Sequence, residues 1–389
     1  MEKILSIDKS CCGCGGCEQV CPKKCISFQQ DQEGFLYPKI EEEKCISCGA
    51  CVKACPIINK AEYHTPKMIL GTKLNNPDRA QKSSSGGVFV PLAEKILEQN
   101  GVVAGCAYDS KLTAKHIIVR SKADLFRLQG SKYVQSDNRN IYTEIKQELI
   151  NGVPVLYTGT GCQVAGLKQF LRKDYDNLFC VDIVCHGVPS PKLFENYIKY
   201  ISETENASVT EFNFRSKKKG WGLNYEVKIG RSGYVGYGFD DPYYNAFLRC
   251  YNYRESCYEC KYACFDRVSD ITLADFWGIE SIAPSFYDKA GVSLVLINTE
   301  KGEKLFSSIK EQVVTFETNK EDAVRMNSNL IAPSQRPDIR NTIYNGFDGD
   351  LKEYFSERLA VKTSLKTKLK RLIPISLKGK IKYYLRNKN

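Results

Sequence analysis

From residue 68 onward, short apolar runs alternate with longer stretches whose apolar positions recur every three or four residues. The short runs are typical of buried strands, and the longer stretches are typical of helices that cover a sheet. This pattern predicts strands at residues 68–72, 102–108, 153–157, 178–184 and 292–298, and helices at residues 89–99, 141–151, 164–172, 192–201 and after residue 301. Such alternation predicts an α/β sheet that is at least partly parallel.

Two segments depart from this alternation. Residues 210–238 interleave aromatic and polar side chains with glycines, which predicts an antiparallel excursion, and residues 28–40 can form a short hairpin. A polar linker at residues 59–67 separates a cysteine-rich module, residues 1–62, from the rest of the chain. The predicted fold class is therefore mixed α+β, with a small N-terminal module, an α/β domain and a C-terminal tail.

Two cysteine runs with the spacing C-x2-C-x2-C-x3-C-P fill the N-terminal module. They are Cys11, Cys14, Cys17 and Cys21 before Pro22, and Cys45, Cys48, Cys51 and Cys55 before Pro56. Bacterial ferredoxins hold [4Fe-4S] clusters with this run, and in two-cluster ferredoxins the fourth cysteine ligates the other cluster. The expected ligand sets are therefore Cys11, Cys14, Cys17 and Cys55 for one cluster, and Cys45, Cys48, Cys51 and Cys21 for the other.

A zinc ribbon or a disulfide framework is the alternative explanation of these runs. Zinc sites use two pairs of ligands, however, and dense disulfides belong to small secreted domains. Two further cysteines of the module, Cys12 and Cys25, fall outside both runs. We interpret them as spectators near the clusters.

The net charge of +11 comes almost entirely from the C-terminal tail. Ten lysines and arginines and no acidic residue lie between Lys362 and the C-terminus, so the rest of the chain is nearly neutral. Leucines and an isoleucine recur at helical spacing on both sides of Pro374, which predicts two short basic amphipathic helices. Peripheral attachment to anionic lipid is the hypothesis that this pattern favours, and a frayed soluble terminus is the alternative.

The remaining apolar stretches are too short to cross a bilayer, and no charged and apolar leader precedes the first cysteine run. We therefore expect a cytoplasmic protein, peripheral at the inner face of the membrane if the tail binds lipid. A reducing compartment suits eighteen cysteines that serve as ligands.

Two glycine-containing turns precede predicted helices. Residues 83–87 read Ser-Ser-Ser-Gly-Gly, and hydroxyls and glycine amides at a helix N-terminus can bind a pyrophosphate; a serine N-cap with a glycine turn is the alternative. Residues 158–161 read Thr-Gly-Thr-Gly between a strand and a helix, where open α/β sheets bind ligands. Cys162 follows at the helix N-terminus, so we expect a lowered pKa for its thiol.

The next predicted strand ends at Cys185 and His186. Because turns at neighbouring strand ends converge, Cys162 and Cys185 can share one site. His186 is one of only three histidines and is the candidate proton donor or ligand; a capped loop residue is the alternative.

A third cysteine group surrounds the pair Cys257 and Cys260. A lone C-x2-C can bind zinc, form a redox pair or supply half of an iron–sulfur site. Downstream of two ferredoxin clusters, a third [4Fe-4S] cluster is the interpretation we favour, because it continues an electron path. Its two other ligands must then come from Cys162, Cys185, Cys250 and Cys264.

Taken in order, these motifs resemble the beta-subunit family of coenzyme F420 hydrogenases and dehydrogenases. The resemblance rests on residues 83–89, 130–136, 158–166, 181–191, 254–260 and 269–278. Members of the family bind FAD, carry an iron–sulfur cluster beside it, and pass a hydride between reduced deazaflavin and the flavin. Many bacterial relatives have a fused dicluster ferredoxin, and some are encoded among polysaccharide-synthesis genes. The resemblance implies a family N-terminal domain at residues 67–150, a C-terminal domain at 151–345 and a separate tail at 346–389.

The resemblance also implies the site residues. It assigns to the flavin pocket Ser85, Gly86, Gly87, Gly130, Ser131, Lys132, Tyr133, Thr158, Gly159 and Thr160. It favours as ligands of the third cluster Cys162, Cys185, Cys257 and Cys260. The chain departs from the family at residue 161, where glycine stands in place of the usual proline.

The predicted function is electron transfer between a flavin, FAD, and [4Fe-4S] clusters, with coenzyme F420 as a two-electron carrier. The expected partners are a redox protein or carrier and a small-molecule or lipid-linked substrate. Two alternatives stay open: a flavin-free iron–sulfur module that serves a separate enzyme, and a nucleic-acid-binding protein that uses the basic tail. The near-neutral body disfavours the second alternative, and no nucleic acid is expected.

Overall fold

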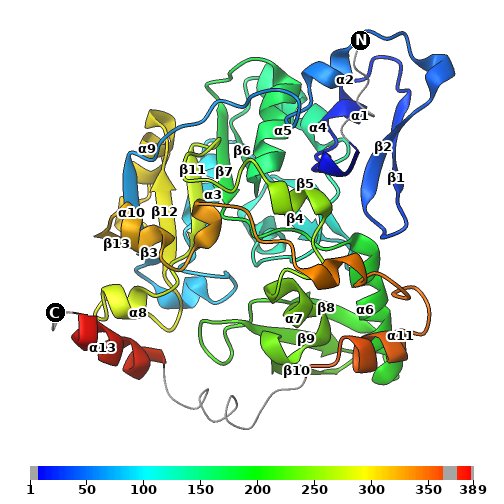
Figure 1. The fold of residues 1–389 in the computed structure, drawn as a ribbon. Coiled ribbons are helices and arrows are strands. Elements are labelled where there is room, and N and C mark those ends of the chain that lie inside the picture. The colour runs from blue at the N-terminus through cyan, green and yellow to red at the C-terminus, as the bar shows by residue number, and fades with distance from the viewer. Residues whose placement is uncertain (1–7, 362–374, 387–389) are drawn as a thin grey trace.

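The structure is a computed structural model and describes residues 8–361 and 375–386. A mixed eight-stranded sheet lies at its centre, in the order β13-β3-β12-β11-β7-β6-β4-β5 (Figure 1). The strands are β3 (Met68–Leu74), β4 (Val102–Tyr108), β5 (Ala114–Val119), β6 (Val155–Thr160), β7 (Leu178–Ile183), β11 (Ile271–Asp275), β12 (Ser293–Ile297) and β13 (Val313–Glu317). Strands β4, β6, β7 and β11 are parallel, which confirms the predicted partly parallel sheet.

Helices cover both faces of this sheet. Helices α3 (Phe89–Glu98) and α9 (Glu300–Ser307) share one core with it, and α4 (Ile141–Ile150) and α5 (Gly161–Leu171) share the opposite core. Strand β6 contributes Leu156 to the first core and Val155 and Tyr157 to the second. Burial on both faces explains why the central strands have continuous apolar runs.

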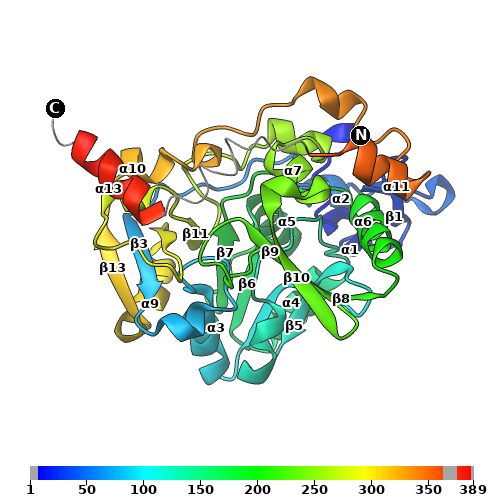
Figure 2. The same cartoon turned by 90° about the horizontal axis from the view of Figure 1, so that it is seen from below.

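A second, three-stranded antiparallel sheet confirms the excursion predicted at residues 210–238. Its strands are β8 (Val209–Asn213), β9 (Asn224–Ile229) and β10 (Ser232–Tyr237), with β9 in the middle. Helices α6 (Pro191–Thr204) and α7 (Pro242–Leu248) lie close to this sheet (Figure 2). They share an aromatic core with it that includes Phe194, Phe214 and Tyr243. In the sequence, these three strands are inserted between β7 and β11 of the large sheet.

The N-terminal module consists of α1 (Gly16–Gln19), the predicted hairpin β1 (Ile26–Gln30) and β2 (Leu36–Ile40), and α2 (Ala50–Lys53). It packs against the body close to the N-termini of α4 and α5. The Gln19 side-chain oxygen accepts hydrogen bonds from the amides of Tyr142 and Thr143, at 2.9 and 3.2 Å, and so caps α4. The Tyr262 hydroxyl donates to the carbonyl of Pro56 at 2.7 Å.

The C-terminal part adds further helices. They are α8 (Ile279–Ile282), α10 (Lys320–Val324), α11 (Leu351–Glu353) and α13 (Ile375–Arg386). Of these, α11 packs on α6 and α13 packs on α8. Helix α13 begins directly after Pro374 and confirms the second predicted tail helix, whereas the first, around Leu365–Leu372, lies outside the described residues. Within the described part of the chain, no helix is both long and apolar enough to span a membrane.

The large sheet takes strands from both sides of residue 150, because β4 pairs in parallel with β6. The two halves assigned to residues 67–150 and 151–345 therefore share one sheet. The division into four domains, at residues 1–62, 67–150, 151–345 and 346–389, stays a prediction.

Candidate functional site

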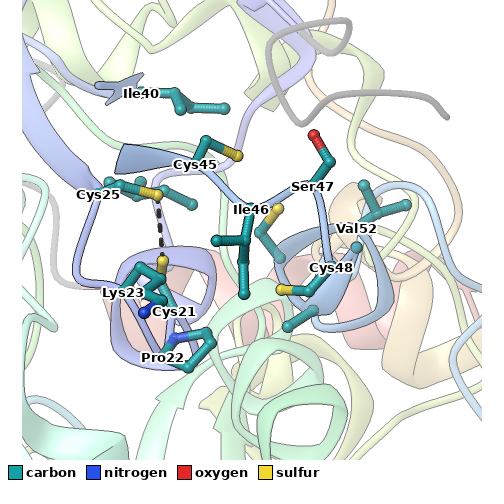
Figure 3. A pocket seen from close by; sticks show the side chains of 14 residues that line it. Cys21, Pro22, Lys23, Cys25, Ile40, Cys45, Ile46, Ser47, Cys48 and Val52 are labelled. Carbon is teal, nitrogen blue, oxygen red and sulfur yellow. Dashed lines mark hydrogen bonds between the residues drawn. The ribbon is translucent and has the colours of Figure 1, made fainter. Parts of the chain in front are cut away.

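The thiols expected to bind one ferredoxin cluster line a common cavity. Cys21 comes from the first run, and Cys45, Cys48 and Cys51 come from the second; they surround a small cavity of about 60 Å³ that is partly open to solvent. Figure 3 shows the sulfurs of Cys21, Cys45 and Cys48 around this space. Cys25 also lines it, with its sulfur 3.4 Å from that of Cys21.

The four cysteines expected to bind the other cluster of the module are all buried. Burial raises the pKa of Cys17 well above its usual value, and the neighbouring thiols of Cys11 and Cys55 raise it further. Cys55 therefore lies beside thiols of the first run, as Cys21 lies beside thiols of the second. Cys11 and Cys14 are buried as well. The structure thus places the fourth cysteine of each run with the other run.

The third group of thiols gathers at the carboxyl ends of two parallel strands. Cys162 lies at the start of α5, directly after β6, and Cys185 follows β7. Burial raises the pKa of Cys257 well above its usual value, and the thiols of Cys185, Cys260 and Cys162 add to the shift. All four residues that the resemblance favoured therefore lie within electrostatic reach of one another.

The two other cysteines considered for this group are placed differently. The Cys264 thiol donates to the carbonyls of Asp266 and Lys261 in its own loop, at 3.1 and 3.4 Å. Cys250 has a left-handed backbone, with φ of 60°, and its carbonyl accepts a hydrogen bond from Tyr258 at 2.6 Å. The geometry favours Cys162 and Cys185 over both.

The expected low pKa of Cys162 is wrong. A hydrogen bond with Cys12 and burial raise the pKa of the Cys162 thiol well above its usual value, and these effects outweigh the helix N-terminus. The Cys12 thiol lies close to those of Cys14 and Cys162; its interaction with Cys14 and its burial raise its pKa well above the usual value. The residue set aside as a spectator therefore joins the first thiol group of the module to the third group of the body.

Within residues 8–361 and 375–386, no three histidine, cysteine, aspartate or glutamate side chains converge closely enough to hold a single metal ion. A tetrahedral zinc site needs its sulfurs within about 2.3 Å of one ion. A cubane spaces its thiolates more widely, because each thiolate binds a different iron. The thiol donors of the dicluster module suit iron–sulfur clusters.

Two of the predicted flavin segments meet through a hydrogen bond. The hydroxyls of Ser84 and Ser131 are 2.7 Å apart, which joins residues 83–87 to residues 130–133. The Lys132 ammonium turns back onto the carbonyls of Arg127, Gln129 and Gly130, at 2.8 to 3.2 Å. Burial lowers the pKa of Lys132 to about 8.

The third flavin segment, Thr158–Thr160, is held by a buried hydrogen-bond chain that the sequence did not indicate. His116 Nε2 lies 3.1 Å from the carbonyl of Thr158, and its Nδ1 lies 3.1 Å from the Ser136 hydroxyl. Gln163 donates to Ser136 at 2.9 Å and accepts from the Thr160 amide at 3.0 Å. Because burial lowers the pKa of His116 to about 4, its imidazole is neutral and positions the turn.

Sequence reasoning also missed a polar network above the Ser84 loop. The Arg215 guanidinium binds both oxygens of Asp275, at 2.5 and 2.9 Å, and donates to the carbonyl of Ser84 at 3.0 Å. The Lys217 ammonium donates to the carbonyls of Ala80 and Ser85, at 2.6 and 2.5 Å. Arg215 and Lys217 belong to the segment interpreted only as antiparallel strands, so no sequence signal marked them.

More basic than acidic side chains lie around these two loops. Lys132, Arg215 and Lys217 surround the two loops, and Asp275 is the carboxylate paired with Arg215. Burial and the charge of Arg215 lower the pKa of Lys217 to about 7. Such a site gains from an anionic ligand, and a dinucleotide pyrophosphate has the required charge.

Two glycines in these motifs are needed for packing. A Cβ at Gly86 would collide with the Thr72 carbonyl oxygen and lie 2.8 Å from the Ser293 nitrogen, so the loop packs directly on β3 and β12. A Cβ at Gly161 would lie 3.0 Å from the Cβ of Tyr262. The glycine that replaces the usual proline therefore lets Tyr262 pack against the start of α5.

His186 lies between the thiol group and this polar network. It follows Cys185 directly, its carbonyl accepts from Ser334 at 2.8 Å, and its ring is near Asn329 and Asp275. Burial lowers the pKa of His186, so the imidazole is neutral. A neutral imidazole can donate or accept a proton, and a catalytic role for His186 stays a prediction.

Comparison with known families agrees with this architecture. Residues 154–322 match the family described as the C terminus of the coenzyme F420 hydrogenase/dehydrogenase beta subunit, and residues 10–58 match the "4Fe-4S dicluster domain". The protein is an iron–sulfur oxidoreductase of the electron-transfer class. Its residues 154–322 form a C-terminal domain of the coenzyme F420 hydrogenase/dehydrogenase beta-subunit family, and the chain carries an N-terminal 4Fe-4S dicluster domain.

A solved structure shows a similar but more distant chain. It is part of the F420-reducing [NiFe] hydrogenase complex from Methanosarcina barkeri, with 17% sequence identity and a TM-score of 0.46. The similarity covers 69% of this chain and 88% of that chain. No curated protein matches the chain.

Proposed function

We propose that the protein is an iron–sulfur flavin oxidoreductase that exchanges electrons between FAD and three [4Fe-4S] clusters. The observation that carries this proposal is the continuity of the sites. The Cys12 thiol lies close to Cys14 of the first thiol group and to Cys162 of the third, and His186 directly follows Cys185 and lies near Asp275. Electrons could therefore pass between the module and the flavin segments within one chain.

The flavin part of the proposal rests on the charged pocket. When bound, FAD would link two-electron chemistry to the one-electron chemistry of the clusters. Lys217 and Arg215 would neutralise its pyrophosphate, and Ser85, Gly86, Gly87, Gly130, Ser131, Lys132, Tyr133, Thr158, Gly159 and Thr160 would shape the pocket. Two of the three Lys217 N–H groups bond to carbonyls, so one donor is left for a ligand.

Coenzyme F420 is the two-electron carrier that we propose on the basis of family membership. A redox partner protein supplies or accepts the single electrons, and the final substrate is a small or lipid-linked molecule. These parts of the proposal rest on the family and on the exposed C-terminal helix rather than on a pocket.

The decisive experiment is a cofactor count on anaerobically purified full-length protein. We expect about twelve irons per chain and about one acid-releasable FAD. A full complement of iron without flavin would leave only the alternative of a flavin-free electron-transfer module. Reduction of the clusters by reduced coenzyme F420, followed by visible absorbance, would test the two-electron carrier.

We further propose that α13 contacts anionic lipid at the cytoplasmic face of a membrane. Its apolar side chains Leu377, Ile381 and Leu385 are 51%, 52% and 65% exposed. Its opposite side packs on α8, since a Cβ at Gly379 would lie 2.5 Å from the Glu280 carbonyl oxygen. Figure 1 shows α13 beside α8 at one end of the molecule. Apolar burial and the basic residues of the tail would act together at an anionic surface.

Co-sedimentation with vesicles tests this contact. The intact chain should sediment with vesicles rich in anionic lipid, and substitution of Leu377, Ile381 and Leu385 by serine should abolish binding, because burial of the three side chains is lost. Ile331→Ser, which changes an exposed isoleucine elsewhere on the body, is the control and should bind like the wild type. Full binding after truncation before Lys362, or no binding by the intact chain, would refute the contact.

A further inference from the structure

Arg254 joins the N-terminal module to the body through a fully buried guanidinium. Its Nε donates to the carbonyl of Cys11 at 2.6 Å, and its two terminal nitrogens donate to Leu36 O and Gln135 Oε1, at 3.0 and 3.2 Å. The ring centroid of Tyr37 lies 3.8 Å from its Cζ. Residues of the module thus surround a side chain that belongs to the loop before Cys257.

This guanidinium differs from the other buried arginines. Four arginines are buried in the described part of the chain, and three of them pair with carboxylates: Arg215 with Asp275, Arg267 with Asp182, and Arg340 with Glu33 and Glu255. Among residues 8–361 and 375–386, no carboxylate oxygen lies within 4.0 Å of the Arg254 nitrogens. The half-buried Asp31, whose pKa responds to Arg254, already accepts hydrogen bonds from the amides of Glu33 and Phe35.

A buried cation without a carboxylate is costly, because neutral carbonyls and a ring replace only part of its hydration. The side chain therefore requires an anion nearby. The groups that can supply one are the thiol sets on either side of it. A Cβ at Gly13, between Cys11 and Cys14, would lie 3.4 Å from the Arg254 Cζ. The Arg254 carbonyl accepts from the Cys257 amide at 2.9 Å.

We propose that Arg254 is the counter-charge of the module cluster held by Cys11, Cys14, Cys17 and Cys55, and that it raises the reduction potential of this cluster. The inference rests on the proposed iron–sulfur function. Four thiolates make the ligated cubane an anion, and reduction adds a further negative charge. A buried cation stabilises the reduced form more than the oxidised form, because Coulomb interactions are strong in a low dielectric. The cluster at the junction with the body would thus accept electrons more readily than the solvent-facing cluster of the same module.

A redox titration of the full-length protein, followed by electron paramagnetic resonance, tests this role. In Arg254→Gln we expect the equilibrium constant for reduction of one cluster to fall about tenfold, which is a shift of 59 mV to more negative potential for a one-electron step. The cluster assigned to Cys45, Cys48, Cys51 and Cys21 is the internal control and should keep its potential. Arg254→Lys, which keeps the charge, should stay close to the wild type.

Arg340→Gln is the matched control for a purely structural role. Arg340 is also buried and also ties the module to the body, through Glu33 and the carbonyl of Tyr253, but its charge is already paired. Its loss should shift the potential much less than the loss of Arg254. Equal shifts of the potential in Arg254→Gln and Arg340→Gln would show that Arg254 has only a structural role, which would overturn the proposal.

The lysine variant keeps the test decisive if Arg254→Gln loses its iron. If Arg254 acts as a counter-charge, Arg254→Lys should keep its iron and its reduction potential. If Arg254 only holds the module to the body through its guanidinium hydrogen bonds, Arg254→Lys should lose iron or change its potential. Unchanged potentials in an iron-replete Arg254→Gln would also overturn the proposal. The potential of the module cluster can be measured without flavin or a third cluster, so failure of this inference is distinguishable from failure of the proposed function.

Discussion

Replacing Cys257 with serine is expected to remove one whole [4Fe-4S] cluster and to lower the iron content from about twelve to about eight atoms per chain. The thiol of Cys257 lies among those of Cys185, Cys260 and Cys162, so its loss opens one corner of the set. The module thiols are separate from this set, and their clusters should be retained. Iron and sulfide analysis after anaerobic reconstitution measures the change.

Cys264→Ser is the matched control for this experiment. Cys264 lies four residues beyond Cys260, but its thiol donates to carbonyls of its own loop, so the variant should keep about twelve irons. Loss of iron from Cys264→Ser together with full iron in Cys257→Ser would show that the proposed ligands of the third cluster are wrong. A wild-type protein with only about eight irons would remove the third cluster altogether.

The thiol groups could be predicted because their signals are local or depend on a simple rule of topology. The spacing within each run is visible in the sequence. Cys162 and Cys185 meet because each follows a strand of one parallel sheet, and the carboxyl ends of parallel strands share an edge. The same rule does not include Cys12, which reaches Cys162 only because the module packs against α4 and α5.

Most central strands were predictable for the same physical reason that the edge strands were not, although the short central strand β11, which includes Thr272 and Asp275, was not predicted. Strands β6 and β12 are buried on both faces and have continuous apolar runs. Strand β13 lies at the sheet edge with exposed or half-buried residues throughout, and β5 at the other edge includes Lys115 and His116. Polar residues on edge strands interrupt the apolar pattern, and neither strand was predicted.

The charged pocket could not be predicted because it depends on contacts distant in sequence. Arg215 reaches Asp275 and Ser84 only in the folded protein, because 60 and 131 positions separate it from them in the sequence. The predicted flavin residues Ser85 and Gly86 lie in this charged pocket, but both already make contacts within the protein. The Ser85 hydroxyl donates to Val292 O at 2.7 Å, and Gly86 packs on the sheet.

This packing determines which variant can test the flavin pocket. A bulky residue at Gly86 would collide with backbone atoms of β3 and β12, so loss of flavin from that variant would follow from damage to the sheet as readily as from a blocked phosphate. Lys217 is a better choice, because its ammonium is the buried cation with an unused donor beside the Ser85 loop.

Lys217→Met is expected to yield protein with at least tenfold less bound FAD and with its clusters intact. Methionine has a similar length but no charge, so the pyrophosphate would lose a charge-assisted hydrogen bond worth about 1.5 to 3 kcal/mol. Acid-released flavin and iron, measured on the same sample, report the two effects separately. Lys218→Met is the control: its ammonium is exposed and pairs with Glu226 at 2.6 Å, so flavin content should not change. Equal flavin content in both variants would show that the phosphate site does not include Lys217. Iron loss in Lys217→Met alone would show instead that the lysine supports the fold around the third thiol group.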